Sequence, residues 1–271
     1  MIIDFHTHGK LAKKLPFSTE YTDWLLGEAH RAGLDAICLT EHFNTLQFDQ
    51  LYGYLLKICE RDGDTLVTPQ GLRIFAGMET DIAEGGHILS IGTPEIILGL
   101  NACLEPYKEK GKFLPFKKLL DLLETYPIIV GAAHPYREGS HIPKLPLEQL
   151  KRLHFLDLNG KDTAKDRVFF EEKTCALAKE LGIPVISGSD THQAVQYGCV
   201  STKFAHSVNT VEALYREMKN GAYEIRVSPN VSFQVKTAGL LKKALKEIHA
   251  LGGDYVSILT SQIDEYRKKR W

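Results

Sequence analysis

Short apolar runs of strand length alternate with longer amphipathic stretches through most of this chain, and this alternation limits the possible folds more than any other feature. The runs predicted as strands are Ile2–Phe5, Ala36–Thr40, Arg73–Met78, His87–Gly92, Ile128–Ala133, Phe155–Leu158, Pro184–Ser187 and Tyr223–Val227. The stretches predicted as helices between them are Thr22–Ala32, Phe48–Arg61, Phe116–Thr125, Arg167–Leu181 and Val211–Asn220. Strands that alternate with helices predict an α/β fold with a mostly parallel sheet.

Signals at the helix ends support parts of this assignment. Thr22-Asp23 is predicted to cap the first helix, and Ala32-Gly33 to end it. Beyond about residue 230 the pattern changes, because Lys236–Leu251 and Ser257–Arg270 form two amphipathic stretches with no strand between them. The sequence therefore predicts a barrel domain over residues 1–230 and a C-terminal helical extension over residues 231–271 that packs on it.

Composition bounds the class of protein. The 271 residues are enough for one large domain, and the net charge of -1 gives no basic field for nucleic acid, which we do not expect as a partner. The five cysteines are scattered and no signal peptide is apparent, which predicts reduced thiols and a cytoplasmic protein. No apolar run has the length of a membrane span, and the sequence indicates no particular oligomeric state.

Histidines and carboxylates recur where the predicted strands end. They are His6 and His8 after the first strand, His42 after the second, Glu79 after the third, His134 after the fifth, and Asp190 and His192 after the seventh. The carboxyl ends of strands in a parallel barrel gather at one face, so these side chains are expected to converge. His87 begins its strand instead, but Gly85-Gly86 before it allows a tight reversal toward Glu79.

Such a cluster predicts a metal centre. Imidazole and carboxylate ligands together suit Zn, Mn or Fe, and the lack of a cysteine in the set argues against a closed structural zinc site. The remaining histidines are interpreted as ordinary surface or core residues, except that His141, on the loop after His134, is a candidate for substrate contact.

Five stretches resemble the motifs of the polymerase and histidinol phosphatase (PHP) superfamily, in that family's order. They are Asp4-Phe5-His6-Thr7-His8, Leu39-Thr40-Glu41-His42, Gly77-Met78-Glu79, His134-Pro135 and Gly188-Ser189-Asp190-Thr191-His192. The resemblance implies a distorted (β/α)7 barrel, two or three divalent transition-metal ions (Zn, Mn or Fe), and metal-dependent hydrolysis of phosphoesters.

The same resemblance implies roles for individual residues. His6, His8, Glu79 and Asp190 would hold one ion, Glu79 would bridge to a second ion completed by His87 and His134, and His42 and His192 would bind the third. The family usually has a further ligand shortly after the first motif, where this chain has Gly9-Lys10-Leu11-Ala12-Lys13-Lys14. Glu20 is the nearest carboxylate, and we predict it as the remaining ligand of a third site that is otherwise incomplete.

The expected reaction needs no nucleophile from the protein. A metal-bound water loses a proton near neutral pH and can attack phosphorus while the ions neutralise the phosphoryl oxygens. Asp190 and His192 are assigned to this catalytic centre, and Arg137, in His134-Pro135-Tyr136-Arg137, is predicted to grip the substrate phosphate. The alternative for Arg137 is a solvated loop residue.

We therefore expect a phosphatase that acts on a small phosphomonoester, such as a histidinol-phosphate-like compound or a nucleotide phosphate. One alternative is a PHP-type exonuclease or oligonucleotide phosphoesterase, which steep salt dependence would reveal. A second is an amidohydrolase, disfavoured because no lysine replaces Glu79 at its strand end. A third is a non-catalytic PHP module, which would have no need of so complete a set of ligands.

Overall fold

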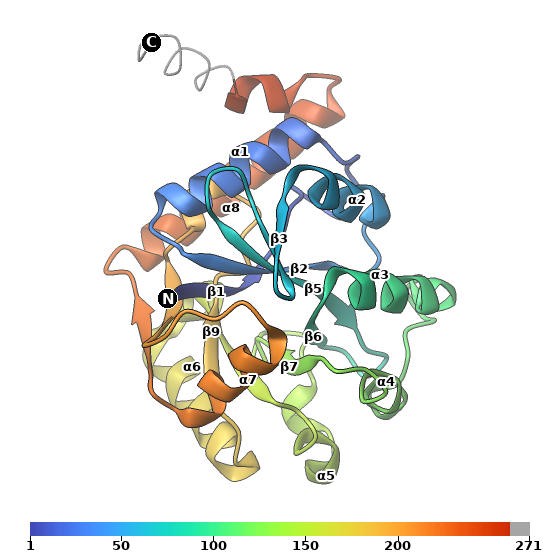
Figure 1. Ribbon diagram of the computed structural model, residues 1–271, viewed down its shortest axis with the longest axis vertical. Helices are drawn as coiled ribbons and strands as arrows, with labels where there is room; N and C mark the ends of the chain where they lie inside the picture. The colour runs from blue at the N-terminus through green and yellow to red at the C-terminus, as the bar shows by residue number, and fades with distance from the viewer. Residues whose placement is uncertain (261–271) are drawn as a thin grey trace.

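A computed structural model describes residues 1–260 of the protein and shows the apolar runs as strands of one strongly curled sheet (Figure 1). Each predicted strand is present, and the sheet follows the path β11-β10-β1-β2-β5-β6-β7-β8-β9. The strands on this path are β1 (Ile2–Thr7), β2 (Ala36–His42), β5 (Arg73–Asp81), β6 (His87–Gly92), β7 (Ile129–Ala133), β8 (Phe155–Asn159), β9 (Val185–Gly188), β10 (Val200–Phe204) and β11 (Tyr223–Val227). The short strands β3 (Glu60–Asp62) and β4 (Thr65–Val67) lie off the path.

The sheet has two parallel blocks, separated by the antiparallel strand β6, and the antiparallel strands β10 and β11 extend it beyond β1. Strands β1, β2 and β5 are parallel, as are β7, β8 and β9, but β6 is antiparallel to both β5 and β7. The turn between β5 and β6 is too short for the helical crossover that parallel strands require. Gly85 and Gly86 make the reversal with φ of 91° and 131°, in the left-handed region that glycine tolerates best.

The sheet curls back on itself where β9 returns to β1. The amide of Asp190 donates to the carbonyl of His6 at 2.7 Å, and the amide of His8 donates to the carbonyl of Thr191 at 3.1 Å. A Cβ atom at Gly188 would overlap the backbone of His6, so this close approach requires glycine. The sheet is thus nearly closed, and the predicted distorted (β/α) barrel is confirmed as the fold class, with the antiparallel strands β6, β10 and β11 as its departures from a parallel barrel.

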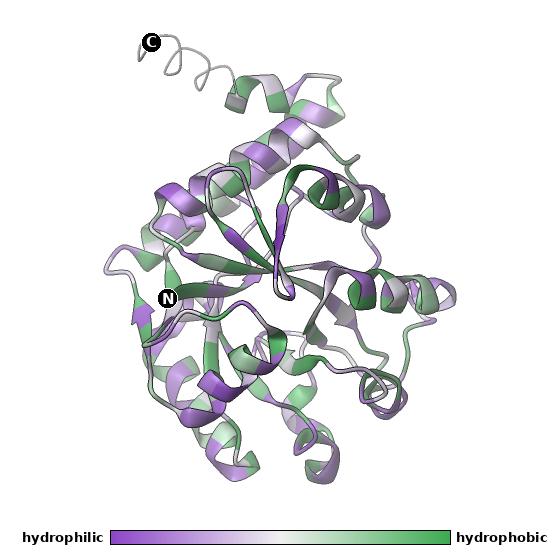
Figure 2. Cartoon of the chain, viewed as in Figure 1, coloured by the Kyte–Doolittle hydropathy of each residue, from purple (hydrophilic) through white to green (hydrophobic). Residues whose placement is uncertain are grey.

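Both faces of the barrel strands β2, β7 and β8 are buried along their whole length. Alternate residues of β2 enter two different apolar clusters, because Ile37 and Leu39 pack with the outer helices and Cys38 packs with Ile3, Phe5 and Phe75. This arrangement is typical of parallel strands covered on both sides. The outer helices carry hydrophilic and hydrophobic residues together, as Figure 2 shows.

The helices within residues 1–260 include each predicted one and add others. They are α1 (Thr19–Arg31), α2 (Phe48–Ile58), α3 (Pro94–Cys103), α4 (Phe116–Leu123), α5 (Leu147–Leu150), α6 (Gly160–Leu181), α7 (Val211–Asn220) and α8 (Val231–Ala250). The predicted cap of α1 at Thr22-Asp23 is wrong, because Ser18 caps the helix and accepts from the amide of Tyr21. Thr22 is instead a helical residue whose hydroxyl donates to the carbonyl of Gly9.

Helix α8 packs against α6 and against the short η3 turn (Ala194–Gln196). The Gln234 amide on α8 donates to the carbonyls of Val195 and Tyr197. Helical residues 255–260 follow α8, and the rest of the predicted helix Ser257–Arg270 lies outside the described residues. None of the helices in the described part of the chain combines the length and apolar character of a membrane span. The division into residues 1–230 and 231–271 stays a prediction.

Candidate metal centre

The structure brings eight of the nine predicted ligands, from six strands, to one rim of the barrel. His6 and Glu79 lie on β1 and β5, His42 ends β2 and His87 begins β6, while His134 follows β7. His8 follows β1, and Asp190 and His192 follow β9. Because β6 runs backward, His87 begins its strand beside the residues that end the neighbouring strands. All of these side chains therefore lie together at the rim, as their positions at the ends of strands predict.

Glu79 is the centre of this histidine cluster. Its Oε1 atom lies 2.6 Å from Nδ1 of His87 and 3.2 Å from Nε2 of His134. Its Oε2 atom lies 2.7 Å from Nδ1 of His42, 3.5 Å from Nε2 of His6 and 3.6 Å from Nε2 of His8. The two oxygens thus face different imidazoles, which is the geometry of a carboxylate that can bridge two ions.

Asp190 and His192 complete the cluster. Oδ1 of Asp190 lies 3.3 Å from Nε2 of His8, 4.0 Å from Nε2 of His6 and 3.9 Å from Nε2 of His192. The rings of His8 and His192 are stacked, with centroids 4.0 Å apart. Asp190 and His134 have positive φ values of 56° and 32°, a conformation that costs energy for residues other than glycine and that is concentrated at functional sites.

Four overlapping groups of these residues have ligand atoms within 4.8 Å of one another. The groups are His6, His8 and Glu79; Glu79, His87 and His134; His6, His134 and Asp190; and His8, His42 and His192. Glu79 belongs to two of the groups, and so do His6, His8 and His134. An arrangement with shared members favours several neighbouring ions over a single one.

The polar atoms at the centre of the cluster fit a divalent cation. Nε2 of His6, Nε2 of His8 and Oε2 of Glu79 are buried and make no hydrogen bond with any residue in the described range 1–260. Buried polar atoms without partners are costly, and a coordinated ion would satisfy all three. Their chemistry, imidazole nitrogen with carboxylate oxygen, suits Zn, Mn or Fe.

The electrostatics of the cluster also call for positive charge. Burial opposes a proton on His6 and on His87, but the surrounding carboxylates together outweigh it. Glu79 acts on both rings, with Asp157 and Asp190 beside His6 and Asp81 beside His87, and the pKa of these rings rises to about 10 and about 9. Burial lowers the pKa of His42 and of His134 to about 4, so both rings are neutral donors at neutral pH. The site therefore holds anionic carboxylates and two neutral imidazoles, and a bound cation would displace the protons of His6 and His87.

Further residues fix the orientation of the imidazoles. Nδ1 of His6 lies 3.0 Å from Oδ2 of Asp157, and Nδ1 of His192 lies 2.9 Å from the carbonyl of Lys10. Nε2 of His87 lies 3.1 Å from Oδ1 of Asp81. Partners of this kind hold a metal-ligating ring in one tautomer and orientation. Asp157 and Asp81 are not among the residues predicted from the sequence, although both lie near the carboxyl ends of predicted strands.

Glu20 is the predicted ligand that the structure does not bring to the cluster. Its exposed side chain lies in the first turn of α1 and accepts a hydrogen bond from the hydroxyl of Ser18 at 2.9 Å. Because α1 already begins at Thr19, Glu20 is held at the helix N-terminus, where a carboxylate is favoured. The group formed by His8, His42 and His192 consists of imidazoles alone.

Arg137 lies against the cluster in a network of its own. Nη1 donates to Oδ2 of Asp190 at 2.7 Å, Nε to Oδ1 of Asp162 at 3.1 Å, and Nη2 to Oδ1 of Asn159 at 2.6 Å. Nζ of Lys161 lies 2.8 Å from the same Asp190 oxygen. Asn159, Lys161 and Asp162 are not among the residues predicted from the sequence, although their position at and just after the carboxyl end of β8 is the same signal that predicts the cluster. His141 lies outside the cluster, with Nδ1 at 2.6 Å from the carbonyl of Glu84.

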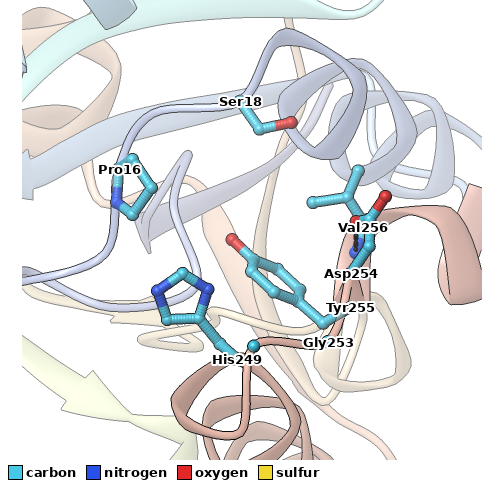
Figure 3. Close-up of a pocket in the computed structure, with 8 residues that line it drawn as sticks. Pro16, Ser18, His249, Gly253, Asp254, Tyr255 and Val256 are labelled. Atoms are coloured by element: carbon cyan, nitrogen blue, oxygen red, sulfur yellow. Dashed lines mark hydrogen bonds between the residues drawn. The ribbon is translucent and has the colours of Figure 1, made fainter.

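A separate cavity of about 340 Å³ lies near the C-terminal part of the described chain (Figure 3). His249 and Tyr255 face each other there with ring centroids 5.8 Å apart, and Pro16 and Ser18 form another part of the wall. None of the cluster residues lines this cavity. Its chemistry therefore gives no reason to place the functional site there.

A curled α/β barrel with a histidine–carboxylate cluster at its rim is the arrangement that the PHP resemblance implies. The family model described as PHP-associated matches residues 171–223. The fold is similar to that of PsfC from Pseudomonas syringae PB-5123, with a TM-score of 0.74 and 22% identity over 90% of this chain and 98% of that chain. A search of curated proteins finds no match.

Two further solved structures share the fold. The lesion-specific endonuclease Q from Pyrococcus furiosus has a TM-score of 0.61 and 18% identity over 83% of this chain and 57% of that chain. A two-domain protein from Bacteroides vulgatus, containing a predicted PHP-like metal-dependent phosphoesterase, has a TM-score of 0.52 and 18% identity over 83% of this chain and 64% of that chain. Together with the PHP-associated match, these likenesses confirm the resemblance to the PHP superfamily.

Proposed function

We propose that this protein is a metal-dependent phosphoesterase that hydrolyses a small phosphomonoester. The observation that carries the proposal is the contact of both Glu79 oxygens with imidazoles from several strands, next to Asp190. Divalent ions held there would activate water and neutralise charge on phosphoryl oxygens. The residues that would hold them are His6, His8, His42, Glu79, His87, His134, Asp190 and His192.

The protein's own groups would prepare this site for an anionic substrate. Arg137 and Lys161 both contact Oδ2 of Asp190, which leaves Oδ1 toward His8 and the rest of the cluster. These two cations hold Asp190 in one orientation. Burial raises the pKa of the Asp190 carboxyl, but the positive charges of Lys161 and Arg137, together with His6, outweigh burial and keep this pKa well below its usual range. The two terminal nitrogens of Arg137 each have a second N–H, which we assign to a phosphoryl oxygen of the substrate.

A covalent mechanism has less support. Ser187 and Ser189 flank the Asp190 motif and are both buried. The hydroxyl of Ser187 lies 3.1 Å from that of Thr202, and the hydroxyl of Ser189 donates to the carbonyl of His6 at 3.5 Å. Neither hydroxyl is paired with a histidine ring that could act as its base. This arrangement favours attack by activated water.

A nuclease is the second candidate. The structural likeness to endonuclease Q favours it, and a further structure of that enzyme holds a 27-mer duplex with an abasic lesion at its active site. The net charge of -1 argues against it, because proteins that hold a polynucleotide neutralise several phosphates with basic side chains. The charge balance leads us to favour the small substrate.

The test compares rates on both substrate classes with Mn, Zn and Fe each supplied. Small phosphomonoesters, a single-stranded oligonucleotide and a duplex with an abasic site are assayed at about 50 mM and about 200 mM salt. We expect faster hydrolysis of a phosphomonoester with weak dependence on salt, and no hydrolysis by the Glu79→Gln variant, which controls for contaminating phosphatases. Faster cleavage of a nucleic acid, with a steep loss on adding salt, would establish the nuclease instead.

A further inference from the structure

A cavity of about 230 Å³ lies between the metal centre and helix α8. Its lining includes one residue of the cluster, two lysines, a glutamine and apolar residues of α8: His192, Lys161, Lys242, Gln196, Val235 and Ala238. Through His192 the cavity borders the histidine cluster directly. A group bound in the cavity would therefore lie beside anything bound at the metal centre.

The two lysines that line this cavity differ in their ion pairs. Lys161 lies 2.8 Å from Oδ2 of Asp190, an oxygen that Arg137 also contacts. Lys242 makes no hydrogen bond or ion pair with any residue in 1–260. Burial and then the nearby charge of Lys161 lower the pKa of Lys242 to about 8. Asp190, shared by Arg137, Lys161 and any bound ions, is thus a poor counterion for Lys242.

The apolar part of the lining strengthens the field of the two ammonium groups. Val235 and Ala238 come from α8, and Ala238 is buried. Charges beside an apolar wall interact more strongly with a ligand than charges in open water. A small acidic group would be attracted by both lysines and would stabilise the proton on Lys242.

We propose that Lys161 and Lys242 bind a second acidic group of the substrate, so that the phosphomonoester also carries a carboxylate or another phosphate. This inference rests on the proposed function for the first group, which would react at the metal centre. Helix α8, in the predicted C-terminal extension, then contributes directly to substrate selection. A competing role for Lys242 is contact with the reacting phosphate itself.

The experiment uses phosphonates, which bind like phosphate esters but lack the bond that is hydrolysed. Phosphonoacetate, 3-phosphonopropionate and 4-phosphonobutyrate are compared with alkylphosphonates of the same chain length, and α,ω-bisphosphonates form a second arm that separates a carboxylate from a phosphate. Binding to the Mn-loaded full chain is measured by calorimetry. We expect at least one doubly acidic probe to bind about ten- to a hundred-fold more tightly than its alkylphosphonate.

Two α8 variants and a control locate the effect. Lys242→Met should remove this advantage and leave alkylphosphonate binding unchanged, while Lys242→Arg should keep most of it. Lys243→Met changes the neighbouring exposed lysine, which does not line the cavity, and should leave all affinities unchanged. Because chelation of the metal by a second acidic group does not involve Lys242, dependence on Lys242 separates the two effects.

The outcomes separate this inference from the proposed function. If no doubly acidic probe has an advantage, or if the advantage survives in Lys242→Met, the inference is overturned. Equal weakening of both probe classes would assign Lys242 to the reacting phosphate and would also overturn it. A Lys242-dependent advantage in a protein that hydrolyses no phosphomonoester would support the second anion site and contradict the proposed reaction.

Discussion

Replacing Glu79 with glutamine removes the negative charge at the centre of the cluster and keeps the size of the side chain. In the structure Oε1 faces His87 and His134, whereas Oε2 faces His6, His8 and His42. The substitution should therefore weaken two ion sites at once. A charge-assisted contact contributes about 1.5–3 kcal/mol, so the loss of two amounts to about 3–6 kcal/mol. At about 1.4 kcal/mol per ten-fold, the product of the two dissociation constants should rise roughly a hundred- to ten-thousand-fold.

The assay for this prediction is calorimetric titration of the metal-free chain with Mn and with Zn, together with hydrolysis of a phosphomonoester. Glu20→Gln is the matched control, because it makes the same chemical change at an exposed carboxylate outside the cluster. We expect the control to keep wild-type stoichiometry and rate. Wild-type affinity and activity in Glu79→Gln would refute the bridging role, and the loss of one ion in Glu20→Gln would restore Glu20 as a ligand.

Three other measurements address the neighbouring residues, the effect of pH and the C-terminal helix. Arg137→Ala should weaken metal binding and lower kcat/KM, each about ten- to a hundred-fold, because Asp190 loses an orienting partner. Unchanged metal affinity would show that Arg137 acts on the substrate alone. Metal affinity should rise between about pH 6 and pH 8, because an ion must displace protons from His6 and His87, whose pKa values are raised to about 10 and about 9. A metal affinity that does not change over this pH range would contradict the prediction. Leu245→Ala on α8 should lower the free energy of unfolding by about 2–5 kcal/mol, because Leu245 is 4% exposed. Leu240→Ala, at a 69% exposed position, is the control and should change this free energy little. Equal denaturation midpoints for the two variants would show that the stability of the protein does not depend on the packing of Leu245.

The sequence predicted the cluster well because its members obey one simple rule. Polar residues that end buried strands gather at the rim of a parallel barrel, and Gly85-Gly86 marks the antiparallel strand β6, whose first residue, His87, lies at the same rim. The same rule, applied to β8, would have found Asn159 and the residues after it. Glu20 was chosen only for its nearness in sequence, and the cap at Ser18 turns it into a surface residue.

Other features depend on contacts that sequence patterns do not contain. Strand β10 has three polar residues in five and forms through antiparallel pairing with β1, some 200 residues earlier in the chain. Helix α3 lacks a polar face along Ile96–Leu100, and its one local signal is Thr93-Pro94 at the N-terminus. The role proposed for Lys242 depends on where α8 lies against α6 and η3, which no local pattern determines.

The most direct test of the metal centre is elemental analysis of the purified chain after reconstitution with Mn or Zn. The shared ligands of the four groups predict about two to three ions per chain, retained after removal of excess metal. Less than about one ion per chain would contradict the metal centre and, with it, the proposed hydrolysis of phosphoesters.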